Sequence, residues 1–100
     1  DHAEAAGLEL PQPRPDTAAT LKASIPEFGS PRNPCDLTAQ VATNPKLFED
    51  CMAAMLADDQ YATVIFPIVY HNPATTPSRM TTLDAMAKAA GKPICIMWIP

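Results

Sequence analysis

The sequence contains only three glycines and no glycine-rich stretch. The phosphate-binding loops of P-loop enzymes and dinucleotide-binding folds need glycines at fixed spacings, because their backbone must approach the phosphate closely. Neither kind of loop is present in this chain. Ser-His-Asp triads, HExxH zinc motifs and paired catalytic carboxylates are also not recognisable. No local motif therefore assigns a nucleotide site or a reaction by itself.

Positive charge is scarce and scattered. The chain has seven Lys and Arg against eleven Asp and Glu, which gives a formal net charge of −4. An acidic chain without a basic cluster has little attraction for nucleic acid or for an anionic membrane. No apolar run approaches the roughly 20 residues needed to span a bilayer. We therefore expect no nucleic-acid partner and no membrane partner.

The three cysteines, Cys35, Cys51 and Cys95, form no close pair. An odd number without close spacing is a poor disulfide framework, and this favours a reducing, cytoplasmic location. The spacing also matches no zinc template, so no metal site is expected. Free cysteines are usually buried, which predicts that Cys51 and Cys95 lie in the core, whereas Cys35 lies in a polar loop.

One hundred residues suffice for one small domain. The chain starts at Asp1 without an initiator Met or a signal peptide, so we expect it to be a piece of a longer protein.

We expect the first 36 residues to be irregular, because prolines are concentrated in this part of the chain. Seven of the twelve prolines lie between Pro11 and Pro45. Residues 1–6 are predicted as the end of a helix that Gly7 stops. The stretch Pro11 to Pro15 should run extended over a surface.

A short helix is predicted from Thr17 to Ser24. Asp16 is a suitable N-cap, and Pro26 ends the helix. Leu21 and Ile25 are its expected apolar contacts.

A longer helix follows, capped by Asn44 with Pro45 at its first position and closed by Asp58-Asp59. Apolar side chains recur at helical spacing along it and predict its buried face. These residues are Phe48, Cys51, Met52, Met55 and Leu56.

The remaining stretch reads as strand, loop, helix and strand. Residues 61–66 and 94–99 are short apolar runs typical of buried strands. Between them, Thr76 is the expected cap of a helix that begins at Pro77 and that Gly91 stops. The inner stripe of this helix is predicted to contain Met80, Leu83, Ala87 and Ala90.

Two strands joined by a helix predict a parallel pair with a right-handed crossover, and hence an α/β fold whose core is residues 44–100. A complete sheet of this class normally has about four or more strands. We therefore expect segments missing from this chain to supply neighbouring strands on both sides.

Ligands of parallel sheets bind beyond the carboxyl ends of the strands, which directs attention to residues 71–78. Thr75, Thr76 and Ser78 surround a helix N-terminus, where free N–H groups and the helix dipole favour an anion. The alternative is that Thr76 only caps the helix and nothing binds.

His71, just past the strand, is a weak catalytic candidate, as a base, a phosphate ligand or a phosphorylated nucleophile. The alternative is a loop histidine bonded to the backbone. Asn33 and Asp36 lie in a second polar loop, which is either part of an active site or a structural turn. Convergence of His71, Asn72 and Asp36 would give an acid–base site in a stand-alone metabolite enzyme.

A longer-range order of motifs resembles one protein family. It runs from a Gly-Leu-x-Leu-Pro opening through Asn-Pro-x-Asp-Leu and a Leu-Phe helix to a Gly-Lys-Pro before the last strand. The order resembles a segment of the NDP-forming (ADP-forming) acyl-CoA synthetases, relatives of succinyl-CoA synthetase. The matching residues are Gly7 to Pro11, Thr17 to Leu21, Asn33 to Thr38, Leu47, Phe48, Asp58, Asp59, Gly91 to Pro93 and Trp98.

The resemblance implies a multidomain enzyme that makes acyl-CoA from an organic acid, CoA and ATP or GTP, through an acyl phosphate and a phosphohistidine. This chain is similar to the interior of its flavodoxin-like ligase domain, a Rossmann-like three-layer parallel sheet. The implied role is a phosphate-stabilising helix N-terminus at Thr76 with the loop of Asn33 and Asp36 beside it, and a docking surface for the other domains or subunits.

On this resemblance CoA, ATP and Mg²⁺ belong to the full enzyme and not to this segment, which should be inactive alone. Succinyl-CoA synthetases have a glycine pair where this chain has Val69 to His71, and Asn72-Pro73 replaces the small residues that follow the phosphohistidine. We therefore do not assign that role to His71. Cys35 stands where valine is common, which suits packing. A third hypothesis is a non-catalytic domain whose sheet edges pair with neighbours.

Overall fold

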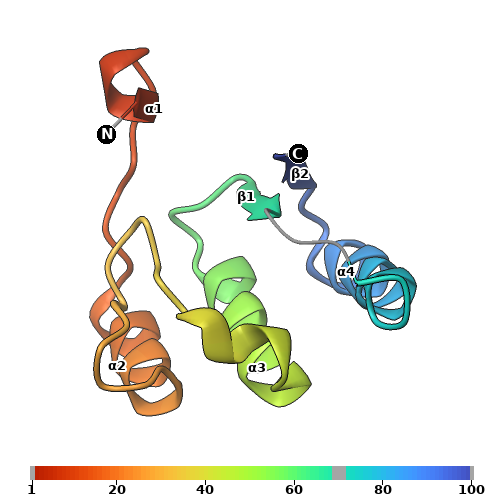
Figure 1. Cartoon of the computed structure of the whole chain (residues 1–100). Helices are drawn as coiled ribbons and strands as arrows, with labels where there is room; N and C mark the ends of the chain where they lie inside the picture. Colours follow the sequence, from red (N-terminus) through yellow and green to blue (C-terminus); the bar gives the residue numbers. More distant parts are fainter. Residues whose placement is uncertain (1, 69–71, 100) are drawn as a thin grey trace. The chain divides into compact units, whose positions relative to one another are not determined.

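The structure, a computed structural model, describes residues 2–68 and 72–99. The chain divides into two compact units, Asp1–Gln60 and Tyr61–Pro100, and each is considered by itself. Figure 1 shows the order of the elements along the chain. They are α1 (His2–Ala5), α2 (Pro15–Ser24), the 3₁₀ helix η1 (Ala39–Ala42), α3 (Pro45–Ala57), β1 (Val64–Ile68), α4 (Thr76–Ala90) and β2 (Ile94–Trp98).

Helix α2 begins two residues earlier than predicted. Pro15 occupies its first turn, and Arg14 is the N-cap residue, so the prediction that Asp16 caps the helix is wrong. The fixed φ of proline suits the first helical position, and the helix therefore starts there. The Asp16 carboxylate instead accepts a hydrogen bond from the N–H of Thr17 at 3.0 Å.

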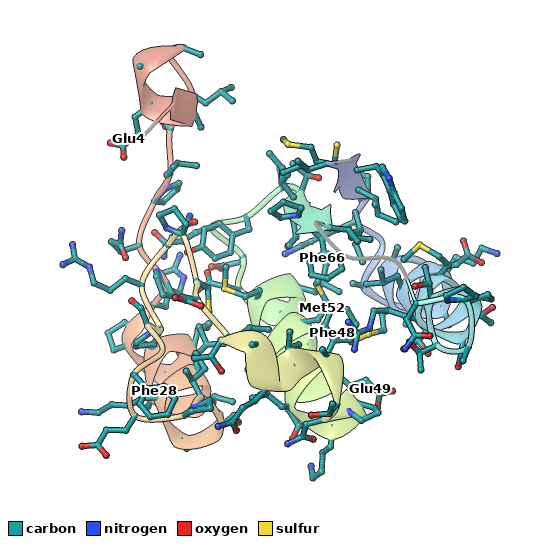
Figure 2. All side chains as sticks on the ribbon, viewed as in Figure 1. Glu4, Phe28, Phe48, Glu49, Met52 and Phe66 are labelled. Carbon is teal, nitrogen blue, oxygen red and sulfur yellow. The ribbon has the colours of Figure 1, made fainter. Side chains whose placement is uncertain are left out.

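Helix α3 agrees closely with the prediction. The Asn44 side chain accepts a hydrogen bond from the N–H of Leu47 at 3.1 Å, Pro45 lies in the first turn, and Asp58 is the C-cap residue. Of the predicted face, Met55 is half-buried and the other four side chains are buried; Figure 2 labels Phe48 and Met52 among them on this helix. The apolar spacing therefore identified the correct side of α3.

The core of the N-terminal unit lies between α2 and α3. Leu21 and Ile25 from α2 and its C-cap pack with Leu47 and Cys51 from α3. Half-buried Cys35 joins this cluster from the intervening loop. The predicted contacts of Leu21 and Ile25 and the burial of Cys51 are thereby confirmed, because both helices turn their apolar side chains inward.

A buried carboxylate ties the start of α2 to the end of α3. Asp58 Oδ2 accepts the N–H of Arg14 at 2.8 Å, and its Oδ1 accepts the N–H of Gln60 at 3.0 Å. The Thr17 side chain also hydrogen-bonds to this carboxylate. The Arg14 guanidinium is paired in addition with the exposed carboxylate of Asp59. We call this group the Asp58 clasp (Arg14, Thr17, Asp58, Asp59 and Gln60).

The C-terminal unit is a parallel β–α–β arrangement, as predicted. Val64 pairs with Ile94 and Ile68 with Trp98 across the two strands. Strand β1 starts three residues later than expected and includes Pro67, while β2 ends at Trp98. Gly91 stops α4 in the left-handed region at φ 66°, as predicted. The described residues thus form a small, partial α/β fold.

Several side chains of this unit are more exposed than predicted. Cys95 and Ala90 are both exposed, so the prediction that they are buried is wrong for each. Leu83 is buried on α4, whereas Met80 and Ala87 are half-buried. The physical reason is that the described sheet has only two strands, so β2 has a neighbour on one edge only.

Candidate functional site

The turn that precedes α4 is organised by Asn72. The Asn72 carbonyl accepts the N–H groups of Thr75 at 3.1 Å and Thr76 at 2.8 Å. Its side-chain Oδ1 accepts the N–H of Ala74 at 2.9 Å, and its own N–H donates to Thr76 Oγ1 at 3.0 Å. Asn72 therefore fixes both the backbone of this turn and the orientation of Thr76.

This network changes which residue caps α4. Thr75 is the N-cap residue and makes no side-chain capping bond, while Thr76 is the first helical residue. The prediction that Thr76 is the cap is therefore wrong by one position. The displacement arises because the Asn72 carbonyl already satisfies the Thr76 N–H, which would otherwise need an acceptor at the helix end.

Few backbone donors remain for an anion at this helix terminus. Thr75 and Thr76 already donate to Asn72, and Pro77 has no N–H. Among the described residues, none accepts a hydrogen bond from the Ser78 N–H. Ser78 is exposed, so this N–H is the backbone donor of the first turn that an anion can reach.

Hydroxyl groups add to this donor. Thr75 and Ser78 are exposed, and the Thr76 hydroxyl keeps its own proton to donate while it accepts from Asn72. The first turn of α4 contains no acidic residue, so nothing in it opposes an anion. The three predicted phosphate-binding residues are therefore adjacent, and their binding of phosphate stays a prediction.

His71, the weak catalytic candidate, lies outside the described residues. Its predicted convergence with Asn72 and Asp36 stays a prediction, as does the placement of the Asn33–Asp36 loop beside α4, because these residues belong to different units.

The loop of Asn33 and Asp36 is held by its own hydrogen bonds. Asn33 exchanges bonds with the Gln12 side chain, and its Nδ2 donates to the Pro11 carbonyl at 3.0 Å. Asp36 pairs with Ser30 through the backbone, and its Oδ1 accepts the N–H of Thr38 at 2.8 Å. The Asp36 side chain thus folds back onto a backbone N–H, which is the arrangement of a structural turn.

Cys35 lies in the same loop and is poorly suited to nucleophilic chemistry. Burial, the neighbouring Cys51 thiol and the Asp36 carboxylate raise the pKa of Cys35 to about 11. Burial also raises the pKa of Cys51. Since the thiolate is the reactive form, both thiols are largely unreactive at neutral pH. Packing is the role that their environment supports.

Metal ligation and membrane insertion find no support in the described parts of the chain. Residues 2–68 and 72–99 contain no cluster of three His, Cys, Asp or Glu side chains that would hold a metal ion. None of the helices within those ranges has the length and apolarity to cross a membrane.

Sequence reasoning missed the Asp58 clasp. The sequence predicts Asp58 and Asp59 as a helix end and as part of the motif order, without a partner for either side chain. The signal that could have revealed it is Arg14, immediately before the Pro15 that starts α2. A helix start supplies free N–H donors and the arginine supplies a positive charge, and both suit a carboxylate such as that of Asp58. Only the folded chain joins these residues across 44 positions.

The chain is similar to a curated trans-feruloyl-CoA synthase from an unknown prokaryotic organism, with 32% identity over 76 residues. It is thus similar to one segment of a CoA ligase. The match covers 76% of this chain but only 11% of the synthase, so the chain spans a small part of that relative's length. No protein-family model and no solved structure matches the chain. The similarity agrees with the CoA-ligase resemblance of its motifs at this general level.

Proposed function

We propose that this chain is part of an NDP-forming acyl-CoA synthetase and belongs to its flavodoxin-like ligase domain. The observation that carries the CoA-ligase part of the proposal is the 32% identity, over 76 residues, to a CoA synthase. The NDP-forming part rests on the order of motifs in the sequence. The parallel β1–α4–β2 unit supports it, because such units place a helix N-terminus beside the carboxyl end of a strand. Cytoplasmic location, CoA, ATP and Mg²⁺ are proposed for the whole enzyme.

The proposed contribution of this segment is electrostatic. The Ser78 N–H, the hydroxyls of Thr75, Thr76 and Ser78, and the positive end of α4 would face the oxygens of a phosphohistidine supplied by another domain. A helix terminus typically stabilises an exposed anion by about 0.3–1 kcal/mol. That magnitude suits a transient phosphoryl group during turnover better than tight storage of free phosphate. Donors fixed in advance by Asn72 would stabilise the developing negative charge without reorganisation.

A phosphate titration followed by backbone amide NMR shifts tests this proposal. We expect shifts centred on Ser78 at millimolar phosphate. Ser78→Ala removes the hydroxyl but keeps the N–H, and should weaken the response. Ser78→Pro also removes the N–H and should abolish it, while proline remains compatible with the first turn of a helix.

Thr81→Ala, one turn further along α4, serves as the matched control and should leave the titration unchanged. Equal responses of the wild-type and Ser78→Pro chains would contradict the proposed site. The isolated chain should make no acyl-CoA from an organic acid, ATP and CoA, and detectable synthesis would show that the segment role is wrong.

The Asn72 turn also favours a second candidate, a non-catalytic assembly domain. Two amides that a phosphate would use, those of Thr75 and Thr76, are already bonded within the turn. If phosphate produces no shifts near Ser78, this structural role becomes the better explanation of the same geometry.

A further inference from the structure

Thr38 has a backbone conformation that residues with a side chain rarely adopt. Its φ is 66° and its ψ is 175°, and within residues 2–68 and 72–99 it is the only residue other than glycine with a positive φ. This region of φ and ψ is occupied almost only by glycine, and a β-branched residue such as threonine is a genuine outlier there. Thr38 is therefore strained, and its surroundings must offset that strain.

Hydrogen bonds hold Thr38 on both sides. Its N–H donates to Asp36 Oδ1 at 2.8 Å, and its Oγ1 accepts the N–H of Gln40 at 3.3 Å. Its carbonyl accepts the N–H of Val41, also at 3.3 Å. The bond to Asp36 is the shortest of the three, and a carboxylate acceptor makes a stronger bond than a neutral one. We call this bond the Asp36 latch.

The loop that follows α2 packs tightly against the latch. A Cβ atom added at Gly29 would lie 2.6 Å from the Asp36 carbonyl oxygen and 3.2 Å from Thr38 Cγ2. Beside this contact, Ser30 and Asp36 exchange two backbone hydrogen bonds of 2.9 Å each. Tightly packed surfaces have few intermediate arrangements. The segment after Asp36 therefore either lies in contact with Gly29 or leaves it.

The residues on either side of the latch connect it to the core. Cys35 and Leu37 are half-buried and pack against the core cluster that contains Cys51. Helix η1 begins directly after Thr38 and contacts α3. A change of Thr38 to a negative φ would alter the chain direction between Leu37 and η1. Leu37 would then lose its contact with the core, and the neighbouring Cys35 thiol would become accessible.

We propose that residues 36–42 form a strained two-state segment, which is closed while the Asp36 latch is made and opens when the latch is lost. In the open state Thr38 relaxes to an ordinary φ, and the pairing of Ser30 with Asp36 is given up. The latch and the strain act on the same equilibrium with opposite signs. The hydrogen bond favours the closed state, whereas the strain of Thr38 favours the open state.

The inference concerns the N-terminal unit alone. Asp36 is also a predicted active-site residue, so opening would change the position of that carboxylate. The argument uses only contacts within residues 29–42 and their packing on the core. It holds whether or not phosphate binds near Ser78.

The three cysteines of the chain provide the measurement. Iodoacetamide alkylation at mildly alkaline pH, followed by peptide mass spectrometry, gives a separate rate for each thiol. Half-buried Cys35 reports local opening, and buried Cys51 in the same core reports unfolding of the whole unit. Exposed Cys95 reports the reactivity of the reagent itself. In the wild-type chain we expect Cys95 to react fastest and Cys51 slowest.

Asp36→Ala removes the latch. We expect it to raise the alkylation rate of Cys35 at least about tenfold relative to Cys95, because a hydrogen bond to a charged acceptor is lost. Cys51 should remain slow. Asp16→Ala is the matched control, since the Asp16 carboxylate also accepts a backbone N–H, that of Thr17 at 3.0 Å, in the same unit. This control should leave the Cys35 rate unchanged.

Substitutions at Thr38 test the strain. Adding Thr38→Gly to Asp36→Ala should return the Cys35 rate towards the wild-type value, because glycine adopts this conformation without strain. Adding Thr38→Ala, which keeps a Cβ atom, should leave the rate high. As single changes, Thr38→Gly should give a slower Cys35 rate than Thr38→Ala. At an unstrained position the order is the reverse, because glycine favours the open chain more than alanine does.

Three results would overturn the proposal. A Cys35 rate that Asp36→Ala leaves unchanged would mean that no latch closes the segment. A Cys35 rate that is as fast with Thr38→Gly as with Thr38→Ala would mean that no strain is released. If Asp36→Ala accelerated Cys51 together with Cys35, the whole unit would be unfolding and the segment would not open by itself.

Discussion

Asp58 shows how a buried carboxylate is kept charged in this chain. Its side chain is fully buried, which by itself raises the pKa of the carboxyl. Hydrogen bonds from the Arg14 and Gln60 N–H groups and the Thr17 side chain, together with the Arg14 charge, outweigh burial and lower the pKa. Loss of this carboxylate would leave several donors without their acceptor.

Asp58→Ala should therefore lower the free energy of unfolding by about 3 kcal/mol, because bonds to a charged acceptor are lost inside the N-terminal unit. Asp59→Ala is the control, since its side chain is 77% exposed and solvent screens its pair with Arg14, so the loss should be small. Urea denaturation followed by circular dichroism measures both. Similar losses in the two variants would contradict the clasp.

The same carboxylate predicts a direction for the pH dependence of stability. A pKa that is lower in the folded than in the unfolded chain stabilises the fold when Asp58 is ionised in both states. This contribution should be complete above the unfolded pKa of about 4 and should be lost as the pH falls below it. Asp58→Asn should flatten the acid limb of a plot of stability against pH. An unchanged acid limb would mean that Asp58 does not titrate with folding.

Single residues were predictable where local spacing decides their environment. Leu21 and Cys51 are buried as predicted, because each lies on the apolar side of an amphipathic helix. Cys95 was not predictable, because its exposure depends on how many strands the sheet has. The part of Asp58 in the clasp depends on Arg14, which only the folded chain brings close.

At the scale of elements, the two long helices start in different ways. Helix α3 has a side-chain cap from Asn44, whereas α4 has Thr75 at the N-cap position without such a bond. In α4, the Asn72 carbonyl replaces the missing cap by accepting the N–H groups of Thr75 and Thr76.

Two alanine substitutions compare how much the N-cap side chains of α3 and α4 contribute to stability. Asn44→Ala should cost about 1 kcal/mol of stability, the usual loss for an N-cap side chain. Thr75→Ala should change stability by less than about 0.5 kcal/mol, since its side chain caps nothing. Thermal unfolding of both variants measures the difference. A larger loss for Thr75→Ala would show that its hydroxyl holds the turn.

The types of the elements were predictable from the sequence. Their observed ends differ from the predicted ones where a proline or the Asn72 carbonyl determines the hydrogen bonding of the backbone. The parallel pairing of β1 and β2 follows from their separation by a helix, and the structure confirms it. Helix α2 starts at Pro15, not at Thr17. Strand β1 includes Pro67 because Val64 and Ile68 hydrogen-bond to the side of β2, so the alternating position 67, which lacks an N–H, faces away from it. Such choices depend on the hydrogen-bond partners of each backbone group, which spacing alone does not reveal.

At the scale of the whole molecule, the described core cluster belongs to the N-terminal unit. Leu21, Ile25, Leu47 and Cys51, and the clasp as well, lie within residues 1–60. The surface of this unit includes Phe28, labelled in Figure 2 on the loop after α2 and 78% exposed. The division into two units was not predicted, because it arises from packing between distant helices.

A fragment of residues 1–60 should consequently keep the helices α2 and α3 and unfold cooperatively. Far-UV circular dichroism and urea titration of the fragment measure this. Leu21→Ala, which empties a fully buried site, should abolish or strongly weaken the transition, typically by about 2–5 kcal/mol. A fragment without helical signal would show that the N-terminal unit needs the rest of the chain.

The position of Asp58 has a consequence for synthesis on the ribosome. Arg14 and Asp58 are 44 positions apart, so α2 leaves the exit tunnel well before the carboxylate that anchors its start. A helix as short as α2 is marginal in water without tertiary contacts. Once Asp58 and Gln60 have emerged, the unit can close as a whole while the β–α–β part is still being made. The N-terminal unit of the nascent chain would therefore become stable once the residues up to Gln60 have left the tunnel.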